Sequence, residues 1–327
     1  MSVLITGSVA YDTVLFHSGA FGDRLAAGAG EGINATFLAR TMRRDFGGCG
    51  ANVAVSMRRL GGEPLLWGAV GRDGDDYLKR FEELSVDRSG LIRLEDAWTS
   101  QCMIFTDRTG GQIAAFHPGA AERSKEAPWP ADGAGCERRP KLAILSPGGR
   151  ETTLHAARAC TDRGIPFLFD VGQELPLFSG DELRTLLDMS FGIAYSDSEA
   201  EAFEAACGLS SAAIARLGRM VVRTHGARGA SLWTAGETKP RFVEPLPVRA
   251  KSPVGAGDAL RGGLMLGLEL GLEPLEAVRL GAVAAARKIS GENAQDYALT
   301  PGLALEDYER IWGEAPAAWR AFVRDRR

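Results

Sequence analysis

Short apolar runs alternate with longer amphipathic segments along most of the chain. The runs are rich in valine, isoleucine, leucine and phenylalanine, as in buried strands, and the longer segments repeat apolar residues at helical spacing. The predicted strands are Val3–Ile5, Pro64–Val70, Leu142–Leu145, Phe167–Phe169, Phe191–Tyr195, Met220–Thr224 and Ala230–Thr234. The predicted helices are Ala51–Leu60, Tyr77–Leu84, Thr152–Arg163, Asp181–Leu187, Glu199–Ala206, Ser211–Leu217, Pro274–Ile289 and Glu306–Trp312. This alternation predicts an α/β fold of three layers, with a mostly parallel sheet between helices.

Two stretches break the alternation. Tyr11 to Phe46 contains a glycine-rich piece and little helical periodicity, and Ser100–Phe116 predicts two strands joined by a turn, Asp107-Arg108-Thr109-Gly110-Gly111. Long irregular insertions in compact domains often form lids. We therefore expect residues 11–46 and 98–118 to form a small β lid, and residues 1–10, 47–97 and 119–327 to form a large α/β domain.

The run from Ser252 to Gly263 has the most specific composition in the chain. A Gly255-Ala256-Gly257 turn leaves backbone N–H groups unshielded, and a helix starting there would add its dipole, so the turn suits an anion. Asp258 follows at once and could take a proton from a hydroxyl that attacks a phosphate. From these residues alone, a glycine-rich turn with an aspartate helix cap is an equal interpretation. Leucines alternate as in a strand beyond this point, but the acidic residue at the start favours a helix.

Composition narrows the classes of partner. The formal net charge is −4, so no basic field exists to hold a nucleic-acid backbone. The 5 cysteines are scattered without a C-x-x-C pair, which suits a reducing cytoplasm. No run approaches about 18 apolar residues, and the N-terminus predicts a buried strand rather than a signal peptide, so no membrane association is expected.

A second glycine block precedes the helix predicted from Ala51. Gly47 and Gly48 would let the main chain approach a polar ligand, and Asn52 could bond a hydroxyl, although a tight turn is the plainer interpretation. Together, this block and the one ending at Asp258 resemble the two signatures of the PfkB, or ribokinase-like, carbohydrate and nucleoside kinases. The resemblance covers nearly the whole chain and rests on two spaced motifs in the right order.

Further segments are similar to the bacterial adenosine-kinase-like nucleoside kinases within that family. These segments are Gly7–Asp12, Ile33–Asn34, Thr41–Cys49, Gln112–Ala120, Phe169–Phe178 and Gln295–Ala298. The resemblance implies a three-layer αβα fold with a small β lid, and ATP-dependent phosphorylation of the 5′-hydroxyl of a ribonucleoside.

The resemblance also implies a role for each site residue. Asp258 would be the catalytic base, and the amides of Gly255, Ala256 and Gly257 would hold the charge of the transferring phosphate. Glu199 would organise Mg²⁺ through water. The implied nucleoside-binding residues are Asp12, Asn34, Gly48, Asn52, Gln112, Phe116 and Gln173, and the implied ATP-binding residues are Ser196, Thr224, Gly226, Gly229 and Val254. The residues themselves leave alternatives open: Asp12 as a turn residue, Phe116 as core, and Glu199 as a first-turn helix acid.

Three positions depart from the family pattern. Ser196 stands where an asparagine usually precedes the glutamate, Ser252 where many relatives carry the aspartate of a monovalent-cation site, and Val254 where a threonine is usual. The resemblance therefore allows K⁺ as a cofactor, but the serine at position 252 weakens the case for a K⁺ site. The alternatives are a kinase for a free sugar such as ribose, and a nucleoside-binding protein that has lost catalysis. Lid strands could leave the chain a monomer or pair it into a homodimer.

Overall fold

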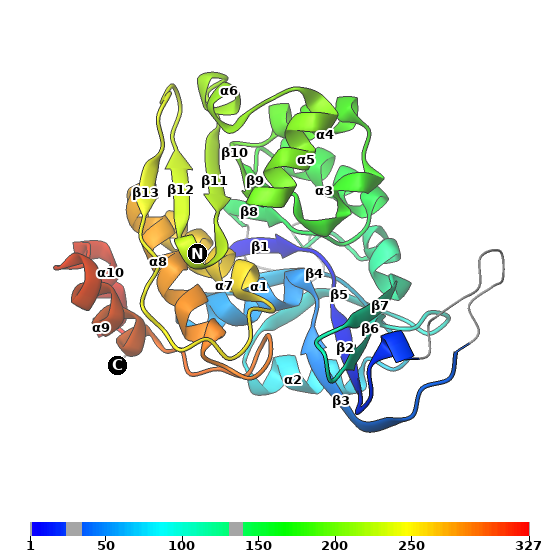
Figure 1. Cartoon of the computed structure of the whole chain (residues 1–327). Helices are drawn as coiled ribbons and strands as arrows, with labels where there is room; N and C mark the ends of the chain where they lie inside the picture. Colours follow the sequence, from blue (N-terminus) through cyan, green and yellow to red (C-terminus); the bar gives the residue numbers. More distant parts are fainter. Residues whose placement is uncertain (1, 24–34, 131–139, 327) are drawn as a thin grey trace.

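The computed structural model describes residues 2–23, 35–130 and 140–326, and it contains two sheets (Figure 1). The larger sheet has the strand order β13-β12-β11-β10-β9-β8-β1-β4-β5 and is parallel from β11 to β5. The strand β12 runs antiparallel to both of its neighbours. The strands are β1 (Val3–Thr6), β4 (Pro64–Gly71), β5 (Asp87–Leu94), β8 (Leu142–Leu145), β9 (Phe167–Asp170), β10 (Gly192–Ser196), β11 (Met220–Thr224), β12 (Ala230–Trp233) and β13 (Arg241–Val243).

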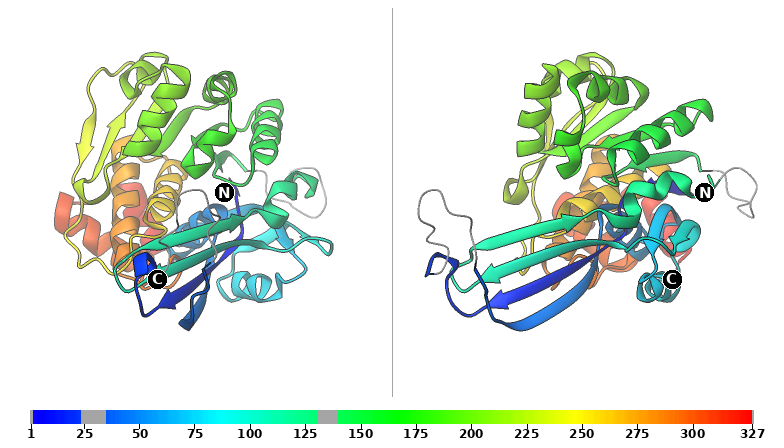
Figure 2. Two further views of the ribbon diagram at one scale, coloured as in Figure 1. Left: turned by 45° about the vertical axis from the view of Figure 1, so that its right-hand side comes forward. Right: turned by 90° about the vertical axis from the view of Figure 1, so that its right-hand side faces the viewer.

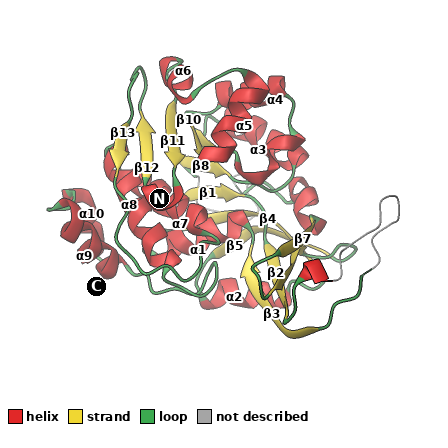
Figure 3. Ribbon diagram, in the orientation of Figure 1, coloured by secondary structure: helices red, strands yellow, loops and turns green. Residues whose placement is uncertain are grey.

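Helices cover both faces of this sheet (Figure 3). One face carries α1 (Cys49–Arg59), α2 (Asp75–Glu83), α7 (Ala256–Glu269) and α8 (Pro274–Ile289), with α9 (Pro301–Trp312) and α10 (Ala317–Arg324) outside α8. The other carries α3 (Arg150–Asp162), α4 (Gly180–Met189), α5 (Asp197–Cys207) and α6 (Ser211–Arg216). Short 3₁₀ segments are η1 (Phe21–Asp23), η2 (Gly119–Glu126), η3 (Gly172–Leu177) and η4 (Gly226–Arg228). The predicted three-layer α/β fold is confirmed.

Alternation along the strands builds one core on each face. In β1, Val3 and Ile5 belong to the cluster beneath α1, α7 and α8, whereas Leu4 belongs to the cluster beneath α3 and α4. Successive side chains of a strand point to opposite faces, so a strand between two helical layers must be apolar throughout. That is why the predicted apolar runs identified these strands.

The smaller sheet projects from the body of the molecule (Figure 2). Its order is β3-β2-β6-β7, with β2 and β6 parallel and the outer pairs antiparallel. The strands are β2 (Ala10–His17), β3 (Ala39–Gly47), β6 (Ser100–Asp107) and β7 (Gln112–His117). Every residue of β7 is exposed, so one edge of this sheet has no packing partner in the described chain.

A few elements were missed. The edge strand β5 begins with the polar run Asp87-Arg88-Ser89-Gly90, which hides its strand character, and β13 and α10 are short. Helix α9 begins at Pro301 rather than Glu306, because the Thr300 side chain caps it and Pro301 fits its first position. No helix in the described ranges is long and apolar enough to cross a membrane.

Candidate active site

The anion-binding turn predicted from sequence lies at the start of α7. Gly255 adopts φ +78°, a left-handed conformation that glycine takes without strain, and no side chain caps the helix end. The first N–H groups of a helix have no partner within it and lie at the positive end of its dipole. The Ala256 N–H donates to the Pro253 carbonyl oxygen at 3.1 Å, whereas no hydrogen bond within the described chain uses the N–H groups of Gly255 and Gly257, so these two suit an anion. Val254, just before the turn, is 53% exposed.

Helix α7 resolves the ambiguity of its leucine pattern. Leu264, Leu266 and their neighbours are buried on several sides, because the helix lies between α1 and α8. Glycines make this close approach feasible: a Cβ added at Gly263 would lie 2.8 Å from the Leu280 carbonyl oxygen on α8. A helix buried all round loses the one-sided stripe that a surface helix shows.

The Asp258 carboxylate is held by a side chain from the glycine block at Gly47 and Gly48. Asn52, in α1, donates from Nδ2 to Oδ2 of Asp258 at 2.8 Å, and its Oδ1 accepts from Gln295 Nε2 at 3.0 Å. Gln295 is fully buried and donates also to the Tyr77 hydroxyl at 2.7 Å. This chain of bonds fixes which end of the Asn52 amide faces the aspartate. Burial raises the pKa of Asp258, and the Asn52 bond partly offsets that rise.

Asp12 shares the space in front of Asp258. It lies in β2 beside β3, where a Cβ on Gly47 would lie 2.3 Å from its Oδ2, so a larger residue at position 47 would displace the carboxylate. Burial raises the pKa of Asp12 to about 6, with smaller contributions from the charges of Asp45 and Asp258. Gly48 follows at φ +88°, and a Cβ there would lie 2.5 Å from the Ser8 carbonyl oxygen. Gly47 therefore brings main chain close to the Asp12 carboxylate, and Gly48 packs against the main chain of Ser8.

The small sheet presents two further predicted nucleoside-binding residues, Phe116 and Gln112, on the same face as Asp12. Asp12, Cys102 and Phe116 are register partners across β2, β6 and β7, and register partners point to one face. Phe116 is 50% exposed, so in this structure it is not a core residue. Gln112 lies four residues earlier on the same face, about 13 Å along the strand. Asn34 lies outside the described residues.

Gln173 approaches the same region from the opposite direction. It is an exposed residue of η3, and its Nε2 lies 3.6 Å from the sulfur of Cys49, the first residue of α1. Burial, together with the nearby Asp258 charge, raises the pKa of the Cys49 thiol. The loop after β9 therefore meets the glycine block at Gly47 and Gly48.

The predicted ATP-binding residues gather at the carboxyl ends of neighbouring strands, where ligands bind in parallel α/β sheets. Ser196 and Thr224 end β10 and β11 as register partners. Asp197 accepts hydrogen bonds from Arg223 Nε at 2.6 Å, His225 Nδ1 at 2.8 Å and Arg228 Nη2 at 2.7 Å. The Gly226–Gly229 turn is thereby fastened to the start of α5, with Gly226 at φ +60° and Gly229 at φ +102°.

Glu199 forms a capping box with Ser196. Its Oε2 accepts from the Ser196 N–H at 2.6 Å, and its own N–H donates to the Ser196 hydroxyl at 3.4 Å. This geometry fits the first-turn helix acid that the sequence left open. In the described parts of the chain no three acidic, histidine or cysteine side chains converge as a metal site. Mg²⁺ would therefore need the phosphate oxygens of its nucleotide as ligands.

Sequence reasoning missed a buried ion pair beside the anion-binding turn. Arg261, one helical turn after Asp258, donates from Nε to Asp170 Oδ1 at 2.5 Å, and the two side chains are only 7% and 2% exposed. Arg261 Nη1 lies 2.9 Å from the position of a Cβ on Gly257, so this glycine makes room for the guanidinium. Burial raises the pKa of Asp170, and the Arg261 charge opposes that rise. The sequence signal that could have indicated this pair is the position of Asp170, directly after a predicted strand.

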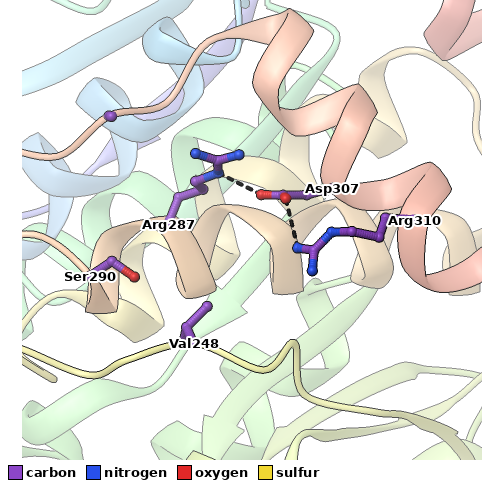
Figure 4. Close-up of a pocket in the computed structure, with 6 residues that line it drawn as sticks. Val248, Arg287, Ser290, Asp307 and Arg310 are labelled. Carbon is purple, nitrogen blue, oxygen red and sulfur yellow. Dashed lines mark hydrogen bonds and ion pairs between the residues drawn. The ribbon is translucent and has the colours of Figure 1, made fainter.

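A separate cavity of about 320 Å³ lies beside the last turn of α8 (Figure 4). Its two arginines are already engaged, because Arg287 and Arg310 both donate to Asp307. The residues that line it are Val248, Arg287, Ser290, Ala298, Asp307 and Arg310, and none of them is a predicted site residue. The cavity is therefore separate from the predicted site residues.

Known proteins share this fold and sequence pattern. The chain is 29% identical over 292 residues to a nucleoside kinase of Methanothermobacter thermautotrophicus, covering 86% of this chain and 91% of that protein. The structure of Burkholderia thailandensis nucleoside kinase in complex with inosine matches with a TM-score of 0.84 and 34% identity, covering 97% of this chain and 99% of that one. The complex of that kinase with ADP-inosine matches with a TM-score of 0.82 and 34% identity, covering 97% of each chain.

The family model described as pfkB family carbohydrate kinase matches residues 9–301. That range includes both glycine blocks, the small sheet and the Asn52–Asp258 contact. The predicted family is confirmed: this chain belongs to the pfkB carbohydrate kinase family and is a phosphotransferase with an alcohol group as acceptor.

Proposed function

We propose that this protein transfers the γ-phosphate of ATP to the 5′-hydroxyl of a ribonucleoside. The observation that carries the proposal is the Asp258 carboxylate, oriented by Asn52 at the N-terminus of α7. Asn52 engages Oδ2, and no hydrogen bond within the described chain engages Oδ1. That oxygen would accept the proton of the attacking hydroxyl as it adds to phosphorus.

The nucleoside would lie between the small sheet and α1. Asp12 and the main chain at Gly48 would bind the ribose hydroxyls, because a carboxylate accepts from two neighbouring hydroxyls. Phe116 would pack on the base, with Gln112 and Gln173 at the edges of the site and Asn52 beside the ribose. The Burkholderia relative, determined with inosine, supports a nucleoside as the acceptor.

ATP would lie along the carboxyl ends of β10 and β11, with its phosphates directed at α7. The amides of Gly255 and Gly257 would bind the oxygens of the transferring phosphate, whose charge is spread over three oxygens during transfer, and the Ala256 amide would join them only by giving up its bond to Pro253. Ser196, Thr224 and the turn from Gly226 to Gly229 would contact the nucleotide, and Val254 would contribute only its main chain and apolar surface. The relative determined with ADP-inosine supports an adenine nucleotide in this family.

Mg²⁺ would be held chiefly by the oxygens of the nucleotide, and Glu199 would contact it through water. When bound, Mg²⁺ offsets phosphate charge. The carboxylate of Glu199 is partly committed to the Ser196 N–H, which limits its contribution to an outer contact.

The small sheet would close over the bound nucleoside as a lid. The sheet projects from the body of the molecule (Figure 2), and every residue of β7 is exposed, so nothing in the described chain covers β7 to oppose such a movement. Closure would exclude water, whose attack on ATP competes with the nucleoside.

The test is ADP release by the purified protein with Mg-ATP across adenosine, inosine, guanosine, cytidine, uridine and ribose, with the product identified by NMR. Turnover of one or more nucleosides to the 5′-monophosphate, with ribose poorly used, supports the proposal. Turnover of ribose alone would replace it with a free-sugar kinase. Nucleoside binding without ADP release would indicate a protein that keeps the fold for binding, and would direct attention to Ser196, Ser252 and Val254.

A further inference from the structure

Lys288 is a fully buried cation beside the anion-binding turn. It lies in the last turn of α8, its side chain is 0% exposed, and its Nζ donates to the Ser252 carbonyl oxygen at 2.9 Å. Among the residues that the structure describes, no carboxylate comes within 4.0 Å of this ammonium. A buried charge without a contact ion pair is costly, so its position needs a reason.

The segment before the turn is fastened to the end of α8 at three points. Besides the Lys288 bond, the N–H groups of Lys251 and Ser252 both donate to the Ile289 carbonyl oxygen, at 2.8 and 3.2 Å. The fastened residues, Lys251 and Ser252, lie four and three positions before Gly255. Movement of the Lys288 ammonium would therefore be transmitted to the amides that face the anion.

Several negative groups surround the ammonium. The C-terminal end of α8 is the negative end of its dipole, the Ser252 carbonyl is in contact, and the Asp258 charge acts on Lys288 from α7. Burial lowers the pKa of Lys288 to about 8, and Asp258 opposes that effect, so the side chain remains mostly charged at pH 7. Lys288 thus supplies a fixed positive charge behind the base and the turn.

This arrangement disagrees with the monovalent-cation site that the family resemblance allows. The position that carries an aspartate in many relatives is Ser252, which has no charge, and its carbonyl already accepts from Lys288. A K⁺ ion on the same carbonyl would meet a like charge at contact distance. The residues here do not fit potassium.

We propose that the Lys288 ammonium is a built-in cation that positions the Ser252–Gly257 segment for phosphoryl transfer, so that the reaction needs no monovalent cation. Lys288 is a positioning residue in this account, because it acts through the segment and does not touch substrate. The proposal rests on the kinase activity proposed above.

The first test measures wild-type turnover of the best nucleoside in two buffers. One contains tetramethylammonium as the sole monovalent cation, and the other contains KCl at about 100 mM in addition. The expected result is kcat and KM equal within about twofold. Stimulation by K⁺ of about tenfold or more would overturn the proposal without affecting the proposed function. This measurement uses the intact protein, so no variant needs to fold.

The second test uses two substitutions that differ in the space they leave. Lys288→Ala should lower kcat and open a cavity lined by the Ser252 carbonyl. K⁺ or NH₄⁺ could occupy that cavity, so either ion should raise the kcat of this variant at least tenfold, with the nucleoside KM little changed. Lys288→Met fills the same space with an apolar side chain, so it should lose a similar factor in kcat and gain nothing from either ion. Full activity in Lys288→Met, or rescue of neither variant, would overturn the proposal.

Two further variants sharpen the result. Lys251→Met, an exposed lysine paired with Glu292 on the same segment, is the matched control and should behave as wild type in every buffer. The double variant Ser252→Asp, Lys288→Ala should depend on K⁺ more strongly than Lys288→Ala alone.

Melting temperature is a readout that does not need turnover: K⁺ should raise the melting temperature of Lys288→Ala but not that of wild type. If wild type turns over no nucleoside, the proposed function fails while this melting comparison still tests the cation site.

Discussion

Asp12 offers a test in which stability and function should move in opposite directions. Its carboxylate is packed against Gly47, faces Asp45 across β2 and β3, and senses the charge of Asp258. In the ligand-free protein these surroundings disfavour the ionised form. Asp12→Asn keeps the shape of the side chain and removes its charge. We therefore expect the variant to be more stable and to bind nucleoside less well.

The magnitude follows from the pKa. Burial raises the pKa of Asp12 from 3.8 to about 6, and each pKa unit corresponds to about 1.4 kcal/mol. Well above pH 6, the ionised carboxylate then costs the folded state about 3 kcal/mol relative to the unfolded chain. Unfolding entropy is about 0.7 kcal/mol/K for a chain of 327 residues, so the melting temperature should rise by about 4 °C.

The sign of the pH dependence follows from the same shift. Because the folded pKa lies above the unfolded one, protonated Asp12 stabilises the fold below the unfolded value, and this stability is lost as pH rises through about 6. The advantage of Asp12→Asn should therefore be full at pH 8, fall to about half at pH 5, and vanish near pH 3. Urea unfolding of both proteins at pH 8 and pH 5 measures it.

A matched control separates this effect from a general gain on losing an acid. Asp162→Asn removes an exposed carboxylate from α3 and should leave stability within about 0.5 kcal/mol of wild type at both pH values. Nucleoside affinity of Asp12→Asn, measured by calorimetry, should fall at least tenfold. Unchanged or lower stability at pH 8, or a gain that does not shrink at pH 5, would refute the reasoning.

Two other predictions follow from the site. Arg261→Met leaves Asp170 buried without its partner and should lower the free energy of unfolding, measured with urea, by about 3–5 kcal/mol. Adding Asp170→Leu should recover most of that loss, and a double variant as unstable as the single one would argue against the ion pair. Phe116→Ala removes a base-packing ring and should raise the KM for nucleosides about 5- to 150-fold while leaving the use of free ribose unchanged, and equal losses for both acceptors would contradict its contact with the base.

The parts of the site that the sequence predicted are local. The Gly255–Asp258 turn is one contiguous segment, and Gly47 and Gly48 are adjacent in another. The backbone requirements of each segment show directly in its residue types. The buried strands were recognisable because both their faces are apolar. Even the Ser196–Glu199 capping box follows from spacing, since a serine three residues before a glutamate is a sequence signal for a helix start.

The parts that the sequence did not predict depend on contacts between distant segments. Asn52 meets Asp258 across 206 positions, and Gln295 reaches Asn52 across 243. Nothing in the sequence pattern around Gln295 predicts that its side-chain amide fixes the orientation of the Asn52 amide. Lys288 is a stronger case, because a lysine in the last turn of a helix is normally a solvated charge that favours the dipole. Only its complete burial distinguishes it.

The most direct test of the central claim is Asp258→Asn, with kcat measured by ADP release and nucleoside affinity by calorimetry on the same preparation. An amide cannot take the hydroxyl proton, but it keeps the size of the side chain and its contact with Asn52. The account predicts that kcat falls about 10²- to 10⁴-fold while the nucleoside Kd stays within about threefold. Turnover unchanged from wild type would remove Asp258 as the base and, with it, the mechanism derived from this site.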